Sequence, residues 1–162
     1  MNRDAPVGAQ EIMPGTYSQL LLHIVFSTKH RELWINPQLA ERLYPYLGGI
    51  VRAEKGTLYS IGGIEDHVHM YLRWRTDGAV ADLMRTVKGR SSLWIHETFP
   101  ELSQFAWQQG YSVFSVSKSQ EHAVKAYIEN QREHHEKEDF RSETLRLLRA
   151  HGVEFDEKYV FD

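Results

Sequence analysis

The stretch HVHMYLRW (residues 67–74) decides the fold, because polar and apolar side chains alternate along its whole length. A period of two residues is typical of a β-strand whose two faces meet different surroundings. One face carries Val68, Met70, Leu72 and Trp74, and the other carries His67, His69, Tyr71 and Arg73. The sequence therefore predicts a sheet with one apolar face and one face that bears two histidines.

The segments on either side of this strand predict an element order of β-α-β-β-α-β-α. Asn36 and Pro37 supply an N-cap and a first-turn proline for the first helix, and Ser119 is the expected cap of the last one. The expected strands span residues 17–28, 57–64 and 67–74, with two short β segments within 105–117 broken near Gly110, and the expected helices span 37–55, 79–97 and 119–135. This order predicts the α+β class and a ferredoxin-like (split βαβ) antiparallel sheet with two helices on one face and an added C-terminal helix.

The composition limits the kind of protein. The chain has 162 residues, 41% of them hydrophobic, which fits one compact domain. It has no cysteine, so disulfides and thiolate metal sites are excluded and a metal must bind His, carboxylate, amide or water. No apolar run approaches the roughly 20 residues of a membrane span, so we expect no membrane association and a cytoplasmic protein. We expect a flexible leader over residues 1–16, a main domain over 17–140 and a tail over 141–162 that packs on the domain.

Two pairs of residues have a spacing that suits chemistry. His67 and His69 project from one side of a strand, roughly 6 to 7 Å apart, which is near enough for both imidazoles to bind one cation. A His-x-His pair is common, and hydrogen-bonded histidines without a metal are the alternative interpretation. Tyr127 and Gln131 are four residues apart and share one face of the last helix. Their spacing alone favours a core aromatic and an exposed amide.

Four stretches occur together in an order that is far more specific than the histidine pair alone. They are GGIEDHVHMYL (62–72), KGRSS (88–92), GYSVFSVSKSQ (110–120) and YIENQREHH (127–135). With them, residues 17–159 resemble the small single-tyrosine transposases of the HUH nuclease superfamily. The resemblance implies that residues 17–140 form the transposase domain, that His67-Val68-His69 is the HUH motif and that Tyr127, on the added helix, is the catalytic nucleophile. It also implies that Gln131 completes a metal site with the two histidines.

The resemblance further implies an activity, a cofactor and partners. The activity is cleavage and rejoining of hairpin-bearing single-stranded DNA through a 5′-phosphotyrosine intermediate. A divalent cation would neutralise the scissile phosphate, and we expect Mg²⁺, with Mn²⁺ as the second choice. Family members act as homodimers in which the tyrosine helix can serve the histidine pair of the partner subunit. The expected partners are therefore DNA hairpins and a second copy of the chain.

Basic residues near the middle of the chain are candidates for DNA binding. The net charge is -3, but residues 73–90 carry five basic and two acidic residues, which fits a phosphate-facing patch or a solvated helix face. The candidates are Arg73, which shares the strand face of the histidines, Lys88 and Arg90 in KGRSS, and Lys29. A surface ion pair is the alternative for Arg73. Tyr71 is expected either to be exposed and stack on unpaired bases or to pack in the sheet.

Other functions fit parts of the pattern. A ferredoxin-like sheet can bind nucleic acid without catalysis, although the paired aromatic signature of RNA-binding sheets is missing here. A replication initiator, or a non-mobile relative that acts on repeated palindromes, shares the same motifs. The nine histidines also allow a metal sensor, but only His67 and His69 have ligand spacing on a strand. His134 and His135, a further turn along the last helix, could be spare metal ligands, but we expect this adjacent pair to diverge and lie at the surface.

Overall fold

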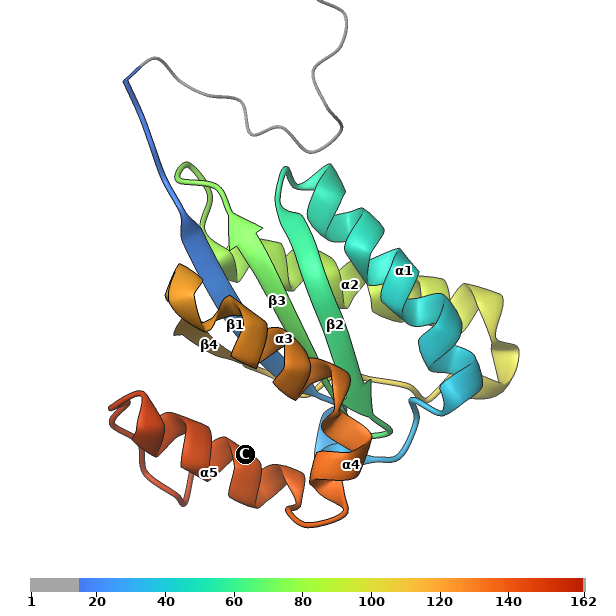
Figure 1. Cartoon of the computed structure of the whole chain (residues 1–162). Helices are drawn as coiled ribbons and strands as arrows, with labels where there is room; N and C mark the ends of the chain where they lie inside the picture. Colours follow the sequence, from blue (N-terminus) through green and yellow to red (C-terminus); the bar gives the residue numbers. More distant parts are fainter. Residues whose placement is uncertain (1–14, 162) are drawn as a thin grey trace, which may run out of the picture.

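The computed structural model describes residues 15–161 and places a four-stranded sheet between two groups of helices (Figure 1). Helices α1 (Pro37–Ala53) and α2 (Val80–Thr98) pack on one face, and α3 (Glu121–Glu129), α4 (Gln131–His135) and α5 (Phe140–Ala150) pack on the other. The leader expected over residues 1–16 lies, apart from its last two residues, outside the described chain. Across residues 15–161, none of the helices combines the length and the apolar character needed to cross a membrane.

The sheet has the predicted split βαβ topology. Its strands are β1 (Leu20–Ser27), β2 (Thr57–Ile64), β3 (His67–Trp74) and β4 (Ser112–Ser115), in the order β2-β3-β1-β4, and every neighbouring pair is antiparallel. The histidine-bearing strand β3 therefore lies in the interior, between β1 and β2. In the region expected to hold two β segments, the part before Gly110 forms a bridge between Trp107 and Thr28 rather than a strand. Turns of 3-10 helix span Lys29–Arg31, Pro100–Leu102 and Lys118–Gln120.

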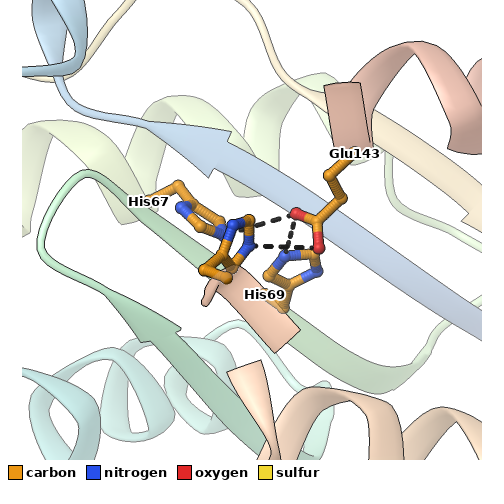
Figure 2. A group of neighbouring side chains, drawn as sticks. His67, His69 and Glu143 are labelled. Atoms are coloured by element: carbon orange, nitrogen blue, oxygen red, sulfur yellow. Dashed lines mark hydrogen bonds and ion pairs between the residues drawn. The ribbon is translucent and has the colours of Figure 1, made fainter. Parts of the chain in front are cut away.

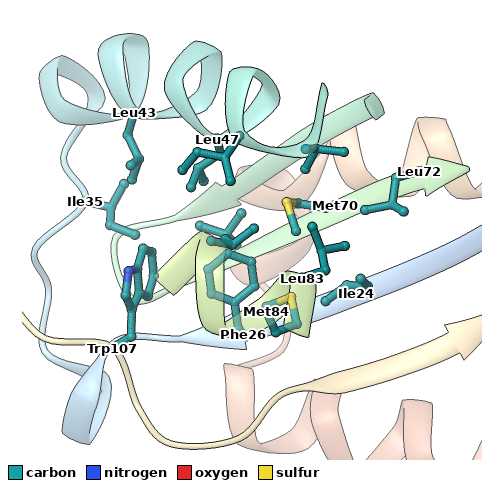
Figure 3. Packing of buried hydrophobic residues seen from close by; sticks show 14 of the residues in the cluster. Ile24, Phe26, Ile35, Leu43, Leu47, Met70, Leu72, Leu83, Met84 and Trp107 are labelled. Carbon is teal, nitrogen blue, oxygen red and sulfur yellow. The ribbon is translucent and has the colours of Figure 1, made fainter. Parts of the chain in front are cut away.

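The face of the sheet under α1 and α2 holds the main apolar core (Figure 3). Helix α1 begins as predicted, because the Asn36 side chain accepts a hydrogen bond from the Leu39 backbone N–H at 2.8 Å. The apolar residues of β3 point into this core, where they meet side chains from β1 and both helices. The core includes Ile24, Phe26, Leu43, Leu47, Val68, Met70, Leu72, Leu83 and Met84, each at most 2% exposed. The alternation in β3 thus predicted the buried apolar face correctly.

The other face is covered by a helix that is broken, not by the single long helix that the sequence suggested. Helix α3 lies close against β2, because a Cβ atom on Gly62 would come within 2.3 Å of the Ile128 carbonyl oxygen. The helix ends at Asn130, whose φ of -102° and ψ of 24° are not helical, and α4 follows at once. The Gln131 side-chain amide donates to the Tyr127 carbonyl at 3.2 Å, which helps to satisfy the backbone at the break. Ser119 is not the cap, since it lies within a 3-10 turn, 3.0 Å from the Ser117 hydroxyl.

Helix α5 packs beside α4 over β1 and β4. Its N-cap is Asp139, whose side chain accepts from the Ser142 backbone N–H at 2.8 Å. Its apolar side chains join residues of both strands and of the chain end in a second cluster. This cluster includes Val25, Phe114, Phe140, Leu147 and Leu148, with Phe155, Val160 and Phe161 packed against it. The contact brings residues far along the sequence onto the histidine-bearing face of the sheet.

Candidate active site

His67 and His69 lie in the interior of the protein and not on an open sheet face. Both side chains are fully buried, because α3, α4 and α5 cover this end of β3. Figure 2 shows the two rings turned toward the carboxylate of Glu143, a residue of α5. The distance from His69 Nε2 to Glu143 Oε1 is 2.9 Å, and that from His67 Nε2 to the same oxygen is 3.4 Å. The histidine pair therefore meets an acidic partner from the last helix.

Each of the two histidines is oriented by a partner on its other ring nitrogen. His67 Nδ1 lies 2.6 Å from Asp66 Oδ1, and His69 Nδ1 lies 2.7 Å from Nε2 of the buried His23 in β1. Contacts of this kind fix the direction of an imidazole and leave its far nitrogen for the site. The sequence offered no period or motif that singled out His23 as such a partner.

Tyr127 in α3 reaches the same site. Its ring centroid lies 5.7 Å from that of His69, and its hydroxyl donates to Glu143 in a short hydrogen bond. Arg146 from α5 donates to the same hydroxyl at 2.9 Å. Burial and the Glu143 carboxylate raise the pKa of Tyr127 above its usual value, whereas the Arg146 charge acts in the opposite direction. Tyr127 and the histidine pair therefore meet within one chain.

Gln131 is also buried at the site, with 1% of its surface exposed. Its Oε1 lies 3.2 Å from His67 Nε2 and 3.0 Å from His135 Nε2. The structure thus brings together His67, His69, Gln131 and Tyr127, the four residues that the resemblance singled out. Gln131 follows Tyr127 by four residues, and both side chains reach the site although the helix is interrupted at Asn130 between them.

Two residues of the site were missed by the sequence analysis. Glu143 has no exposed surface, and His135, expected at the surface, is 4% exposed with its Nε2 3.2 Å from Glu143 Oε2. The expectation that both histidines of the adjacent pair lie at the surface is wrong, because α5 covers His135, and His134 is only partly exposed beside Glu138. A signal for Glu143 exists in the sequence: it lies on the apolar stripe of α5 with Phe140, Thr144, Leu147 and Leu148.

The pKa values at the site differ sharply between neighbouring groups. Burial would lower the pKa of His67, but its hydrogen bonds to Asp66 and Glu143 outweigh this and raise it to about 9. Burial lowers the pKa of His69 to about 4 and that of His23 to about 3. For Glu143, burial alone would raise the pKa, but hydrogen bonds from His135, His67 and His69 hold it far below its usual value. The site thus keeps its carboxylate ionised although the Glu143 side chain is buried.

Two of the predicted DNA-binding residues, Arg73 and Lys88, are separated from this cluster. Arg73 is on the face predicted, but six residues along β3 from His67, which is roughly 20 Å of strand. The Lys88 ammonium group donates hydrogen bonds to the backbone carbonyls of Gln108, at 2.7 Å, and of Gly110. Burial lowers the pKa of Lys88 to about 8. Lys29 and Arg90 are exposed.

Tyr71 is not available to stack on bases. It has no exposed surface, and its hydroxyl donates to Glu121 Oε2 at 2.6 Å. The expectation that Tyr71 is exposed is therefore wrong, whereas the alternative, packing on the sheet, holds. Helix α3 covers Tyr71, and periodicity within β3 cannot report a helix that packs on it from elsewhere in the chain.

A split βαβ sheet with a buried His-x-His pair on its central strand, facing a tyrosine on a later helix, defines the class of single-tyrosine HUH transposases. Residues 16–131 match the family model described as Transposase IS200 like, and the chain belongs to this family. It is 26% identical over 129 residues to the ISDra2 transposase TnpA of Deinococcus radiodurans, which covers 76% of this chain and 90% of that protein. It is also 26% identical over 132 residues to the transposase for insertion sequence element IS200 of Salmonella typhimurium, covering 78% and 86% of the two chains.

Solved structures show the same fold. A crystal structure of a transposase from Deinococcus radiodurans R1 superposes with a TM-score of 0.61 at 27% identity, covering 72% of this chain and 94% of that one. A REP-associated tyrosine transposase bound to a REP hairpin superposes with a TM-score of 0.57 at 13% identity, covering 91% and 89%. At 13% identity, the similarity to the REP-associated transposase shows only that the fold is shared. This superposition covers more of the chain than the one with the Deinococcus structure.

Proposed function

We propose that the protein cuts and rejoins hairpin-bearing single-stranded DNA, with Tyr127 as the nucleophile and His67, His69 and Gln131 as ligands of a divalent cation. One observation carries this proposal: the Tyr127 hydroxyl and the buried histidine pair meet at one point, although 58 residues separate His69 from Tyr127 in the sequence. Membership of a transposase family supplies the reaction class. The substrate is supported by the REP-associated neighbour, which is bound to a hairpin.

The side chains present suit a strand-transfer reaction. Tyr127 Oη would form a bond to the scissile phosphorus while the bond from phosphorus to the 3′ oxygen breaks, leaving a 5′-phosphotyrosine and a 3′-hydroxyl. The hydrogen bond that Tyr127 donates to Glu143 fixes the direction of the hydroxyl group. Attack by a 3′-hydroxyl on the phosphotyrosine reverses the step and rejoins a strand. A bound Mg²⁺ or Mn²⁺ ion would supply charge neutralisation at the phosphate oxygens.

We propose that each site is assembled in cis. The Tyr127 ring lies edge-on to His69 of its own chain, and the Gln131 amide donates to the Tyr127 carbonyl, so the nucleophile and the ligand are positioned together. The homodimer implied by the resemblance then serves to hold two DNA ends rather than to complete a site. Mixing the Tyr127→Phe and His67→Ala proteins tests this arrangement, since shared sites would restore activity and cis sites would not.

Covalent capture of DNA tests the proposed chemistry. Hairpin-bearing single-stranded DNA labelled on the 3′ side of the cleavage point is incubated with the protein and Mg²⁺ or Mn²⁺, and the adduct is resolved on a denaturing gel. We expect an adduct with the natural protein, no adduct with Tyr127→Phe and a normal adduct with Tyr71→Phe, which removes another buried phenol from the same face. An adduct that persists in Tyr127→Phe contradicts the assignment of the nucleophile.

The exposed basic residues are proposed to contact the DNA backbone. Each phosphate contact contributes roughly one unit to the slope of log affinity against log salt. We expect Lys29→Ala and Arg90→Ala to flatten this slope, because their side chains are exposed. Arg73 and Lys88 remain predicted contacts, and an unchanged slope after their replacement by alanine would exclude them.

A second function with the same chemistry is favoured by one observation. The REP-associated neighbour covers 91% of this chain, including the region beyond residue 131 where the family model ends. We propose as the alternative that the protein nicks repeated palindromes without moving an element. Cleavage of dispersed palindromes without joining of element ends would favour this alternative over transposition.

A further inference from the structure

Two of the imidazoles above β3, those of His67 and His135, hold their Nε2 atoms toward the centre of the site. His67 Nδ1 lies 2.6 Å from the Asp66 carboxylate, and His135 Nδ1 lies 2.6 Å from the Glu138 backbone carbonyl. A carboxylate and a carbonyl accept hydrogen bonds, so both Nδ1 atoms carry the proton and donate it. In neutral rings, the Nε2 lone pairs of His67 and His135 therefore point into the site.

These lone pairs meet oxygen atoms that also accept. Gln131 donates through Nε2 to the Tyr127 carbonyl, so its Oε1 faces inward, 3.2 Å from His67 Nε2 and 3.0 Å from His135 Nε2. The Glu143 oxygens lie 3.4 Å and 3.2 Å from the same two nitrogens. Acceptors packed against acceptors in a buried volume are unfavourable unless a positive charge lies between them. Extra protons or a bound cation would supply it.

We propose that Glu143 and His135 are further metal ligands beside Gln131, so that four side chains with imidazole or carboxylate groups, His67, His69, His135 and Glu143, bind one divalent transition-metal ion. The proposal rests on the proposed function for its role in DNA cleavage. Their ligand atoms all lie within 4.8 Å of one another. Two atoms that bind one ion at about 2.1 Å are separated by about 3.0 to 3.4 Å, and the contacts of Glu143 with the three rings, at 2.9 to 3.4 Å, fall in this range. Gln131 Oε1 borders the same point.

The donor set decides which ions fit. Mg²⁺ prefers oxygen ligands and keeps several waters, whereas imidazole nitrogen suits first-row transition metals. Three imidazoles and one carboxylate therefore favour Mn²⁺ and its neighbours over Mg²⁺. With one carboxylate, a dication keeps a net positive charge, which would attract a DNA phosphate. Glu143 lies beyond residue 131, so α5 contributes to the site from outside the region that matches the family.

Binding of Mn²⁺ alone, without DNA, tests the proposal. The full-length protein is stripped with a chelator and titrated with Mn²⁺, and the free ion is followed by electron paramagnetic resonance. We expect one tight site, weakened at least about 100-fold in Glu143→Gln and in His135→Ala, because loss of a ligand costs no less than loss of a residue that supports one. Matched controls are Glu129→Gln and His122→Ala, exposed residues of the same types on α3, which should bind within about threefold of the natural protein.

A measurement on the natural protein avoids any folding defect of the variants. Pulsed paramagnetic resonance of the Mn²⁺ complex counts coordinated nitrogens, and we expect three, from His67, His69 and His135. Two nitrogens, unchanged affinity in Glu143→Gln, or equal losses in the His122 and Glu129 controls would overturn the proposal. Cleavage that rises in Glu143→Gln without a change in Mn²⁺ affinity would also overturn it, since the carboxylate would then be blocking the site.

These outcomes separate the metal site from the proposed function. We expect Tyr127→Phe to bind Mn²⁺ as the natural protein does, because the phenol is not a ligand. If the four ligands are found but no covalent DNA adduct forms, the proposed function fails and the metal site stands. If the adduct forms and Glu143 is not a ligand, the metal site fails and the proposed function stands.

Discussion

The two faces of β3 are equally buried but are stabilised by opposite kinds of contact. On the face under α1 and α2, Val68 and Met70 have no exposed surface and pack among apolar side chains. On the face under α3, α4 and α5, His67 and His69 have no exposed surface either, and their contacts are with carboxylate, amide and imidazole groups. Neighbouring residues of one strand thus lie in two different environments.

This difference separates stability from chemistry within one sheet. Apolar burial is favourable and needs no exact partner. Buried polar groups lose their contacts with water and are stable only while each partner is in place. The apolar face can account for the stability of the fold, so the cost of the polar face is explained best by a function. Substitutions at successive positions of β3 should therefore have opposite consequences.

Loss of His69 should have the largest effect on activity. We expect His69→Ala to reduce DNA cleavage by about 10³-fold or more, because it removes a ligand and a contact of Glu143. The cooperative thermal transition should be retained, since the apolar core is untouched. Rates of adduct formation, compared with circular dichroism melting curves, check both parts. A protein that melts without a cooperative transition would mean that the polar face carries the fold.

Met70→Ala should have the opposite outcome one position along the strand. A cavity at this fully buried position should lower the free energy of unfolding by about 2 to 5 kcal/mol. Each kcal/mol corresponds to about 2 to 4 °C in melting temperature for a chain of this size. The cleavage rate of the folded protein should stay near that of the natural protein at low temperature. Strong loss of cleavage without destabilisation would contradict the division between the faces.

The sequence predicted the contacts of the apolar face of β3 more completely than those of its polar face. Alternation in β3 and helical spacing in α1 and α2 were enough for the apolar face, because periodicity reports burial directly. The histidine pair was visible, but its convergence with Tyr127 and Gln131 was inferred from resemblance, since spacing cannot show which distant segments meet. Arg73 illustrates the limit: its face was predicted correctly, whereas its distance from the histidines along the strand separates it from the site.

The contacts of Glu143 and the helix break at Asn130 could not be predicted from local sequence patterns. Glu143 contacts His69 across 74 residues of sequence, and its place on an apolar stripe shows only that the carboxylate is buried. Which face α5 covers depends on packing against Val25 and Phe114 from two other strands. No glycine or proline marks the break after residue 129, so helical spacing alone predicted a continuous helix there.

Alkaline pH should destabilise the metal-free protein through the polar face. His67 has a pKa of about 9 in the folded protein and about 6.5 when unfolded, so its proton stabilises the fold fully below pH 6.5. This contribution, about 3 kcal/mol from the size of the shift, is lost as the pH rises from 6.5 to 9. His69 and His23 have lowered pKa values, so stability also falls as the pH drops below 6.5. Denaturant unfolding in chelator across this range checks the expected maximum near pH 6.5.

Asp66→Asn is the control for the alkaline loss. Without the carboxylate at 2.6 Å, the pKa of His67 should fall and the stability should vary less between pH 6.5 and 9. Saturating Mn²⁺ should reverse the trend, because protons compete with the metal for the imidazoles. A natural protein whose stability stays flat over this range would exclude a protonated His67.

Arg146 should give the smallest effect on the polar face. Its guanidinium donates to the Tyr127 hydroxyl at 2.9 Å and lowers the pKa of the phenol against the opposing effect of burial and Glu143. Arg146 is about half exposed, so water screens its charge, and we expect Arg146→Ala to slow cleavage only about tenfold. The pH at which cleavage becomes independent of pH should move upward, because the phenolate becomes harder to form.

A merely structural role would slow cleavage without moving the pH profile. Arg146→Lys should restore part of the shift, since it keeps the positive charge but not the planar geometry. Arg149→Ala is the matched control, because this residue lies on the same helix but pairs with Glu157 at 2.8 Å and lies over the Phe155 ring. If Arg149→Ala shifts the profile as much as Arg146→Ala does, the effect belongs to the charge of α5 as a whole, and the hydrogen bond to Tyr127 is not its cause.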